Sequence, residues 1–430
     1  MEKNMSRTLI QGGRLVDPAN GIDGIRDLLL DQGRIVKVAE SITDDKAEVI
    51  DATGRVVMPG LIDLHVHLRE PGFEYKETVM TGAQAAARGG VTTICPMPNT
   101  NPAIDSPERI RDLMERAKDA PVHILPVGAV TLQQEGQKLA DIVGMKEAGA
   151  VALSEDGKSV MDTLVFRHGL QAAAEAGLPM FSHCEDKPLV DGGVMNDGQK
   201  AKELGLPGIT NAVEDVIVAR DIFMAKETGC QLHLCHCSTA DSVVLVELAK
   251  KQGLPVTAEV CPHHFTMSDD EITEDHGRFK MNPPLRSKAD VKALQQGLSD
   301  GIMDVISTDH APHGAEEKDQ SMLQAPFGIV GLETSFALAY TQLVLGGYLS
   351  LSDLVEKMSV NPAKVLGIPK GTLAEGSVAD LVIVELETEY AIDSSTFVSK
   401  GKNTPFDGKR VYGRVEKTLV DGEVVYDEVQ

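Results

Sequence analysis

Basic residues are scarce in this chain of 430 residues, which has 41 Lys and Arg against 65 Asp and Glu and a net charge of −24. This acidity excludes nucleic acid and anionic membrane surfaces as partners, because both require a basic protein surface. No apolar run reaches the ~18 residues of a membrane-spanning helix. The first residues lead directly into strand-like sequence without the apolar core of a signal peptide. We therefore predict a cytoplasmic protein with no membrane or nucleic-acid partner.

Cysteine pairs of the Cys-x-x-Cys type are also absent. The six cysteines are scattered along a chain too large to need disulfide bonds for stability, so we expect reduced and mostly buried thiols. Cys235 and Cys237 flank His236, which by itself suggests a metal site. On a strand, however, both thiols point to the face opposite His236. We therefore do not assign the cysteines a role in metal binding.

Strand-like sequence is concentrated at the two ends of the chain. Short apolar runs near the start, such as 8–15 and 27–30, and near the end, such as 417–420, are separated by glycine-containing turns. Because chain termini often lie close together, we expect both ends to form one small domain. We predict a composite β-sandwich from residues 1–58 and 370–430, with residues 59–369 inserted into it.

The middle of the chain alternates strand and helix patterns eight times. Repeated strand–helix units of this kind are typical of a parallel (β/α)₈ barrel of the TIM type. A doubly wound open sheet is the alternative, but no Gly-x-Gly-x-x-Gly follows the first strand, which disfavours its dinucleotide-binding form. We expect the eight strands at 61–65, 91–95, 122–127, 150–153, 180–182, 231–235, 256–260 and 304–307.

Histidine and aspartate residues occur at the ends of five of these predicted strands. The first strand ends in a His-x-His pair, and both side chains of such a pair face the same way. Because the C-terminal ends of barrel strands converge on one opening, we expect the polar residues there to meet. Burying so many polar groups without a metal or another partner would be costly. The six candidate ligands are His65, His67, Asp156, His183, His236 and Asp309.

Histidine and carboxylate ligands without a thiolate favour a catalytic zinc site. Six ligands exceed what one tetrahedral Zn²⁺ binds, so we predict two Zn²⁺ per chain, bridged by Asp156 and a hydroxide. Such a hydroxide attacks a polarised carbonyl, and Asp309 would bind one metal and also carry the proton. The neighbouring Glu155 is an alternative to Asp156, because spacing alone does not separate the two. These features predict a hydrolase.

Four motifs give the chain a resemblance to a known family. The chain resembles the dihydroorotases of the amidohydrolase superfamily, in the bacterial class of this chain length, over essentially its whole sequence. The resemblance implies reversible conversion of L-dihydroorotate and water to N-carbamoyl-L-aspartate, a step of de novo pyrimidine (UMP) biosynthesis. The motifs are Pro59-Gly60-Leu61-Ile62-Asp63-Leu64-His65-Val66-His67-Leu68-Arg69-Glu70-Pro71-Gly72, Met97-Pro98-Asn99-Thr100, Met281-Asn282-Pro283-Pro284-Leu285-Arg286 and Ser307-Thr308-Asp309-His310-Ala311-Pro312-His313.

The resemblance also implies roles for individual residues. The six candidate ligands match the metal ligands of the family, in which two histidines hold each metal and Asp156 touches both. Asp309 matches the ligand that doubles as catalytic acid and base. The planar guanidinium of Arg69 also suits an anionic substrate on physical grounds, since it offers a fork to a carboxylate. The matching substrate contacts are Arg69, Asn99 and His313 for the substrate carboxylate, and Asn282, Phe327 and Gly328 for the pyrimidine ring.

Two other functions remain as alternatives. Hydantoinases and allantoinases of the superfamily bridge their metals with a carboxylated lysine near the end of the fourth strand, but residues 151–156 contain no lysine. Arg69 and Asn99 also favour a substrate that carries a carboxylate. A non-catalytic scaffold for aspartate transcarbamoylase is the second alternative, but such homologues lack the ligands that this chain has. We expect a homodimer, and an active enzyme that also binds aspartate transcarbamoylase is compatible with the resemblance.

Three features near the predicted site are less well defined by the sequence. His263 and His264 follow the seventh strand and would support the ligands from behind. His310 adjoins Asp309 and would orient it. The polar segment 314–324 is long for a loop that follows a strand, so we hypothesise that it forms a lid over the substrate.

Overall fold

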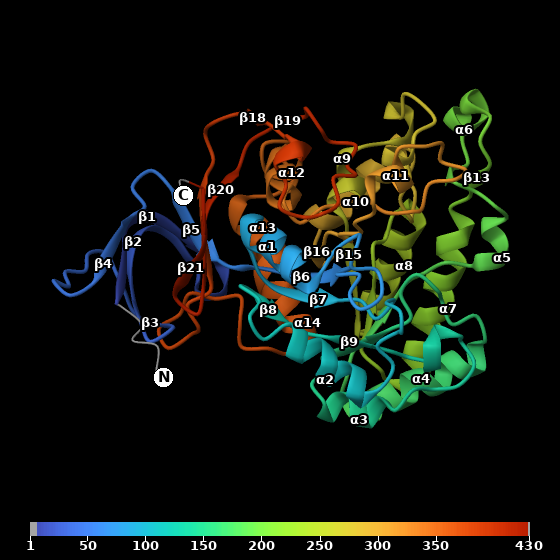
Figure 1. Cartoon of the computed structure of the whole chain (residues 1–430), viewed down its shortest axis with the longest axis horizontal. Coiled ribbons are helices and arrows are strands. Elements are labelled where there is room, and N and C mark those ends of the chain that lie inside the picture. The colour runs from blue at the N-terminus through green and yellow to red at the C-terminus, as the bar shows by residue number, and fades with distance from the viewer. Residues whose placement is uncertain (1–6, 429–430) are drawn as a thin grey trace.

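The computed structural model describes residues 7–428 of the chain. Figure 1 shows two regions: a sheet built from the blue and red ends of the chain, and a larger region in which strands alternate with helices. None of the helices formed by the described residues is both long and apolar enough to cross a membrane. All six cysteines are buried and free, as the sequence predicts.

Both ends of the chain contribute strands to one eight-stranded sheet. Its strands are β1 (Thr8–Asp17), β2 (Ile22–Asp31), β3 (Arg34–Ala39), β4 (Glu48–Asp51), β5 (Val56–Pro59), β17 (Leu381–Glu385), β20 (Arg414–Val420) and β21 (Glu423–Asp427). Their order is β21-β20-β17-β5-β1-β2-β3, and β4 pairs with β1 beside this path. The antiparallel pairing of β5 with β17 joins the two ends of the chain.

Two-residue turns connect strands of this sheet at places that the sequence marks. Gln32 and Gly33 have φ values of 49° and 74° between β2 and β3, and Asp421 and Gly422 have 51° and 76° between β20 and β21. Positive φ at both central residues is what the tight hairpin turns matching the strand twist require. The residue pairs Gln32-Gly33 and Asp421-Gly422 therefore mark the positions of these two hairpins in the sequence.

The middle of the chain forms two parallel sheets. The first contains β6 (Leu61–Val66), β7 (Val91–Pro96) and β8 (His123–Ile124), and the second contains β9 (Val127–Ala129), β10 (Ala152–Ser154), β11 (Met180–Ser182), β14 (Leu232–Leu234), β15 (Val256–Val260) and β16 (Val305–Ile306). The strand that we predicted at 122–127 is thus two short strands, because Pro126 has no N–H to continue the ladder. A parallel bridge between Val66 and His310 links the segment after β16 back to β6.

Helices follow these strands, and side-chain caps define where several of them begin. Thr78 accepts a hydrogen bond from Thr81 N at the start of the first helix, and Ser287 accepts one from Asp290 N at the start of another. Asp141 caps a helix that begins at Ile142. The main helices are α1 (Val79–Arg88), α2 (Pro107–Arg116), α3 (Ile142–Glu147), α4 (Thr163–Ala176), α7 (Ala212–Thr228), α8 (Ala240–Lys251), α10 (Lys288–Ser299) and α12 (Ser335–Ala339).

Short elements occupy the connections around the C-terminal ends of the parallel strands. The longest of these connections leads from β11 to α7, and it contains two short helices and a two-stranded parallel sheet. The short elements of the chain are α5 (Lys187–Val190), β12 (Met195–Asn196), α6 (Gln199–Leu204), β13 (Gly208–Ile209), α9 (Pro262–Thr266), α11 (Ala315–Lys318), α13 (Leu351–Val355), α14 (Asn361–Leu366), β18 (Tyr390–Ala391) and β19 (Arg410–Val411).

Candidate functional site

The His-x-His pair of β6 lies against the carboxylate of Asp156, which follows β10. His65 Nε2 is 3.2 Å from Asp156 Oδ1, and His67 Nε2 is 3.5 Å from Oδ2. Asp309, which follows β16, places its Oδ1 2.9 Å from His67 Nε2 and 3.6 Å from His65 Nε2. The ends of three strands therefore bring two imidazoles and two carboxylates together.

The other two predicted histidine ligands also lie against Asp156, beside the oxygen that His65 contacts. His183 and His236 follow β11 and β14, and their Nδ1 and Nε2 atoms lie 3.5 and 3.6 Å from Asp156 Oδ1. His183 Nδ1 is also 2.9 Å from His236 Nε2. All these side chains are buried. The structure thus brings the six predicted ligands into one cluster.

Asp156 and its neighbour Glu155 have different surroundings. These surroundings show which of the two carboxylates belongs to the ligand cluster, a choice that sequence spacing left open. Glu155 Oε2 accepts hydrogen bonds from the backbone N–H groups of Val130 and Thr131, both at 3.1 Å, and its Oε1 accepts one from the Thr131 hydroxyl. Its carboxylate is therefore used to hold the loop after β9. Asp156 is the carboxylate that faces the histidines.

A further buried carboxylate, that of Glu259 on β15, contacts the cluster through His65. Its Oε1 is 2.9 Å from His65 Nδ1, and its Oε2 is 3.1 Å from His233 Nε2. Burial would raise the pKa of Glu259, but His233 and His65 lower it well below its usual value. Glu259 was not among the predicted site residues, although an acidic residue inside the apolar strand Val256–Val260 was a signal.

Two other histidines of the cluster also donate a hydrogen bond from the ring nitrogen that points away from the cluster. His67 Nδ1 is 2.8 Å from Asn99 Oδ1, and His183 Nε2 is 2.7 Å from Glu185 Oε2. Glu185, which we also missed, accepts a further hydrogen bond from Asn282 Nδ2 at 2.9 Å. A ring nitrogen that donates outward leaves the inward nitrogen with a lone pair, which is the usual arrangement of metal-binding histidines.

The polar atoms inside the cluster fit a metal. His65 Nε2 and Asp156 Oδ1 are buried without a hydrogen-bond partner among the described residues. The 2.9 Å approach of His183 Nδ1 to His236 Nε2 requires a proton or a cation between the two lone pairs. Nitrogen and oxygen donors of this kind suit divalent metals. Ligand atoms lie within 4.8 Å of one another in two groups, His65, Asp156 and His236, and His65, His67 and Asp309.

The charge balance of the cluster also favours a bound metal. Burial would raise the pKa of Asp156, but His65, His183 and His236 lower it well below its usual value. Burial lowers the pKa of His183, but Asp156 and Glu185 raise it to about 10. The buried carboxylates therefore need positive charge beside them, which a divalent metal would supply.

Three residues of the site have a left-handed backbone. Arg69, His236 and Asp309 have φ values of 61°, 35° and 48°. Residues other than glycine rarely adopt such values, and the cost, of order 1–3 kcal/mol each, must be met by surrounding contacts. The backbone here is shaped to direct side chains into the cluster at the ends of strands.

Positive side chains gather beside the ligand cluster. Arg69 donates from Nε to Pro312 O at 3.1 Å, and its Nη2 lies 3.3 Å from His313 Nε2. His313 Nε2 donates to Phe327 O at 2.8 Å, and its Nδ1 accepts from Lys76 Nζ at 3.1 Å. Burial, together with Arg69 and Lys76, lowers the pKa of His313 to about 2. His313 is therefore neutral, and both of its ring nitrogens are engaged.

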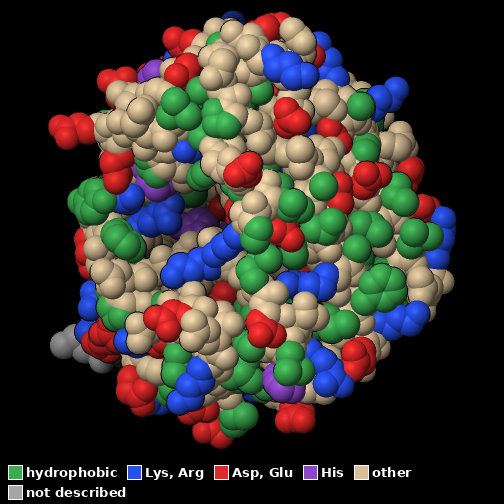
Figure 2. Space-filling view, turned by 90° about the vertical axis from the view of Figure 1, so that its right-hand side faces the viewer, with side chains coloured by type: hydrophobic (Ala, Val, Ile, Leu, Met, Phe, Trp, Pro, Cys, Tyr) green, Lys and Arg blue, Asp and Glu red, His purple; other side chains and the backbone are tan. Residues whose placement is uncertain are grey.

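One cavity collects these groups. All predicted site residues line it except His65 and His313. Figure 2 shows a hollow on one face of the molecule in which histidine and basic side chains are visible. The lining residues are His67, Arg69, Asn99, Asp156, Gly157, His183, His236, Asn282, Asp309, Ala311, Phe327 and Gly328.

His264 and His310, two histidines near the cluster, have hydrogen-bond partners outside it. His264 Nε2 donates to Pro283 O at 2.9 Å, so it supports the loop that carries Asn282. His310 Nε2 lies 3.3 Å from Glu77 Oε2, and its Nδ1 accepts from Gly331 N at 3.2 Å. The expectation that the His310 side chain orients Asp309 is therefore wrong.

The segment 314–324 is anchored beside the cavity. It contains α11, whose last residue Lys318 is buried. Lys318 Nζ donates to the carbonyls of Lys280, Pro326 and Gly328 at 2.9, 2.8 and 2.8 Å. The segment thus contacts the backbone that lines the cavity, and its action as a lid stays a prediction.

Comparisons with known proteins agree with this geometry. A family model described as dihydro-orotase-like matches residues 54–242. A protein of Pelotomaculum thermopropionicum named dihydroorotase is 48% identical over 422 residues, which cover 98% of this chain and 99% of that protein. Another dihydroorotase, from Syntrophus aciditrophicus, is 47% identical over 98% of this chain and 100% of its own. The solved structure of L-hydantoinase (dihydropyrimidinase) from Arthrobacter aurescens is 29% identical, with a TM-score of 0.86 over 99% of this chain and 97% of that one.

Glu259 offers a test of the metal cluster. The substitution Glu259→Gln removes the charge behind His65 but keeps the shape of the side chain, and it is expected to weaken Zn²⁺ affinity by about 10–100-fold. The measurement is a titration of Zn²⁺ into the metal-free chain, with circular dichroism to confirm folding.

Glu155→Gln provides the matched control, because Glu155 is another buried glutamate beside the cluster, and it holds Val130 and Thr131 instead. It is expected to lower the melting temperature and to leave Zn²⁺ affinity nearly unchanged. Equal losses of affinity in both variants would show that Glu259 acts only through general stability.

Proposed function

Because the chain belongs to the dihydroorotase family, we propose that it hydrolyses the cyclic amide of L-dihydroorotate reversibly to N-carbamoyl-L-aspartate. This reaction is a step of de novo pyrimidine biosynthesis. The observation that carries the proposal is the cavity in which the metal-ligand cluster lies beside Arg69. Such a cavity offers groups for amide hydrolysis next to a cation for the substrate carboxylate.

We propose that the two parallel sheets close into one (β/α)₈ barrel, residues 59–369. The bridge between Val66 and His310 and the direct succession of β8 and β9 support closure at both junctions. We also propose that residues 1–58 and 370–430 form one composite domain, in which the shared sheet bends at the register shift between Ile10 and Gly13 of β1 and encloses its core as a sandwich.

We propose that the cluster holds two Zn²⁺, with the two histidines of β6 on one metal and the histidines after β11 and β14 on the other. Asp156, within 3.6 Å of all four imidazoles, would contact both metals, and Asp309 would complete the first site. The amidohydrolase family is metal-dependent, and bound zinc supplies polarisation of the amide carbonyl and acidification of water. Glu259, Glu185 and Asn99 would fix the imidazole orientations.

The substrate would bind with its carboxylate toward Arg69. The Arg69 guanidinium is half-buried and lines the cavity, next to Asn99 and His313. A planar fork of N–H donors holds a carboxylate in a fixed orientation. Asn282 and the backbone of Phe327 and Gly328 line the same cavity and would contact the pyrimidine ring.

Asp309 is the group that we propose moves the proton. Hydrolysis adds water to the ring carbonyl and breaks the C–N bond, so the water must lose a proton and the leaving nitrogen must gain one. Asp309 Oδ1 lies 2.9 Å from His67 Nε2, at the edge of the cavity that receives the substrate. One carboxylate at that place would accept the first proton and deliver it to the nitrogen.

Ring-opening of hydantoin or allantoin is the competing activity, since the structural relatives include hydantoinases. The bridging position here is Asp156, and Arg69 favours a carboxylated substrate, whereas the scaffold-only alternative leaves the complete ligand cluster without a purpose. The homodimer, a complex with aspartate transcarbamoylase and a cytoplasmic location stay predictions.

An ultraviolet assay of dihydroorotate hydrolysis, beside hydantoin and allantoin, tests the proposed function directly. We expect turnover of dihydroorotate at a kcat/KM well above that of the other two amides. Chelation should abolish the activity and Zn²⁺ should restore it, with metal content measured on the same samples. Full activity in a metal-free sample would overturn the metal assignment, and a preference for hydantoin would overturn the substrate.

Arg69→Met tests the carboxylate contact. Loss of a charge-assisted hydrogen bond costs about 1.5–3 kcal/mol, so KM for dihydroorotate should rise about 10–100-fold. Hydrolysis of an uncharged cyclic amide should change much less. Arg111→Met, an exposed arginine of α2, serves as the control and should behave as the unmodified chain. An equal loss for charged and uncharged substrates would exclude a carboxylate contact.

Asp309→Asn tests the proton transfer. Asparagine tolerates the left-handed backbone at this position, whose φ is 48°, and keeps an oxygen ligand. We expect kcat to fall by about 10²–10⁴-fold, the usual contribution of general acid–base catalysis, while calorimetry still detects substrate binding. Near-normal turnover with normal metal content would assign the proton transfer to another residue.

A further inference from the structure

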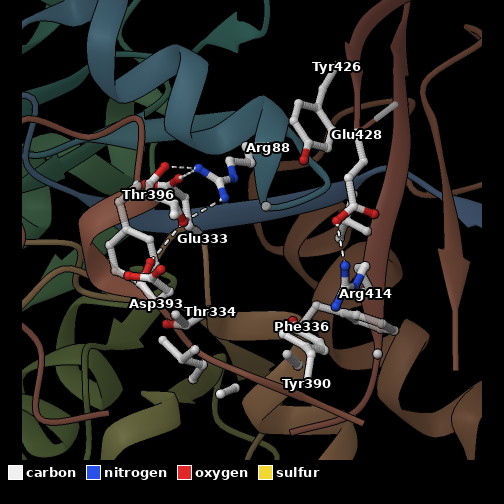
Figure 3. A pocket seen from close by; sticks show the side chains of 17 residues that line it. Arg88, Glu333, Thr334, Phe336, Tyr390, Asp393, Thr396, Arg414, Tyr426 and Glu428 are labelled. Atoms are coloured by element: carbon white, nitrogen blue, oxygen red, sulfur yellow. Dashed lines mark hydrogen bonds and ion pairs between the residues drawn. The ribbon is translucent and has the colours of Figure 1, made fainter. Parts of the chain in front are cut away.

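A segment near the end of the chain, residues 396–404, crosses toward the cavity, and we call it the strap. Figure 3 shows how it begins: Arg88 of α1 is joined by dashed lines to Thr396 and to Glu333. Arg88 Nη2 donates to Thr396 Oγ1 at 3.1 Å, and its Nη1 lies 3.3 Å from Glu333 Oε1. The Glu333 carboxylate accepts the backbone N–H groups of Val398 and Ser399 at 2.8 and 3.1 Å. The first half of the strap is therefore fixed to the body of the protein.

The strap next contacts residues adjoining the ligand cluster. Ser399 Oγ and Lys400 N both donate to the carboxylate of Glu77, which is fully buried. Glu77 Oε2 also lies 3.3 Å from Nε2 of His310, the neighbour of Asp309. The strap is thus tied to the same loop that supplies a predicted ligand.

Gly401 allows the strap to lie directly on that loop. A Cβ atom at this position would be 2.7 Å from Pro312 Cβ and 2.9 Å from Asn403 Oδ1, closer than real Cβ contacts allow. Only glycine permits so close a backbone approach. The strap therefore packs against the loop between Asp309 and His313 without an intervening side chain.

Asn403 joins three backbone groups of the cavity wall with one amide. Its Nδ2 donates to Ala311 O at 3.3 Å and to Gly328 O at 3.1 Å. Its Oδ1 accepts the backbone N–H of His313 at 3.2 Å. Only 7% of its surface is exposed. All these contacts are to backbone atoms, so they set the distance between two segments of the wall.

The two segments that Asn403 joins are those proposed to hold the substrate. Gly328 lines the cavity with φ of 130°, a backbone conformation available to glycine, and its carbonyl also accepts from Lys318 Nζ at 2.8 Å. His313 Nε2 donates to Phe327 O at 2.8 Å, which couples the two segments a second time. A backbone hydrogen bond from Ala311 N to Ile329 O at 2.8 Å also joins the segments, one residue beyond Gly328. Asn403 adds the side-chain hydrogen bonds that fix Ala311, His313 and Gly328 relative to one another.

We propose that Asn403 is a positioning residue of the substrate pocket and that the strap, far from the ligands in sequence, belongs to the functional site. Asn403 does not line the cavity, so it acts through Ala311, His313 and Gly328. This inference rests on the proposed function, because it requires that the Phe327–Gly328 backbone and His313 contact the substrate. It adds a residue that neither the ligand motifs nor the resemblance assigns.

Asn403→Leu tests the inference, because leucine keeps the volume of the side chain and removes its hydrogen bonds. We expect KM for dihydroorotate to rise about tenfold, as lost positioning weakens binding by ~1.4 kcal/mol, with kcat within about threefold of the original. Zn²⁺ content should be unchanged, since the ligands are not touched. Asn403→Ala, which cannot clash, should show the same division between KM and kcat if the leucine variant does not fold.

Asn361→Ala is the matched control. Asn361 begins α14, and its Nδ2 donates to Asp304 O at 3.0 Å, away from the cavity. We expect this variant to lower the melting temperature without changing KM. If the unmodified chain is active and the folded Asn403 variants have the same KM as the unmodified chain, Asn403 does not position the substrate pocket. The role of Asn403 would also be excluded if turnover fell only as much as the amount of folded protein. If the unmodified chain does not hydrolyse dihydroorotate, the proposed function itself is wrong.

Discussion

The carboxylate of Asp156, buried among four imidazole rings, is the constraint on which the rest of the site depends. A buried negative charge is costly unless positive charge and hydrogen bonds surround it. The imidazoles come from the ends of three strands, β6, β11 and β14, and only parallel strands that end at one place can bring them within 3.6 Å of one carboxylate. The fold therefore also determines the charge balance of the site, because the converging strands place the imidazoles around the Asp156 carboxylate. A bound divalent metal would add the remaining positive charge.

Further buried polar groups around the cluster fix the orientation of its imidazole rings. Glu259 holds the outward nitrogen of His65 and is itself held by His233, while Glu185 holds His183. Each contact fixes which ring nitrogen carries the proton and therefore which one faces inward. Acidic residues in this chain thus have two separate uses. Most of the excess negative charge belongs to the surface, but a few carboxylates are buried where they orient metal ligands.

The parts of the fold and site that could be predicted from sequence are those decided by local rules. Strand ends with polar residues predicted the ligand cluster, and turn pairs predicted the hairpins, but Pro126 divides one expected strand in two. Spacing could not separate Asp156 from Glu155, because backbone N–H groups distant in sequence decide which carboxylate is occupied. Asn403 escaped prediction for the same reason, because its partners lie on other elements. Glu259 stands out as an acidic residue in an apolar strand, but its histidine partners could not be read from that pattern.

The cations beside the ligand cluster explain how so acidic a chain can receive an anion. Burial lowers the pKa of Arg69 from its usual value, and burial with Lys280 and Arg69 lowers the pKa of Lys318 to about 7. Both shifts express the same fact, that positive charge is held here away from water. The carboxylate of an anionic substrate would pair with the Arg69 guanidinium that lines the cavity. A neutral cyclic amide of similar shape offers no such partner, so Arg69 favours a carboxylated substrate independently of any contact with the ring.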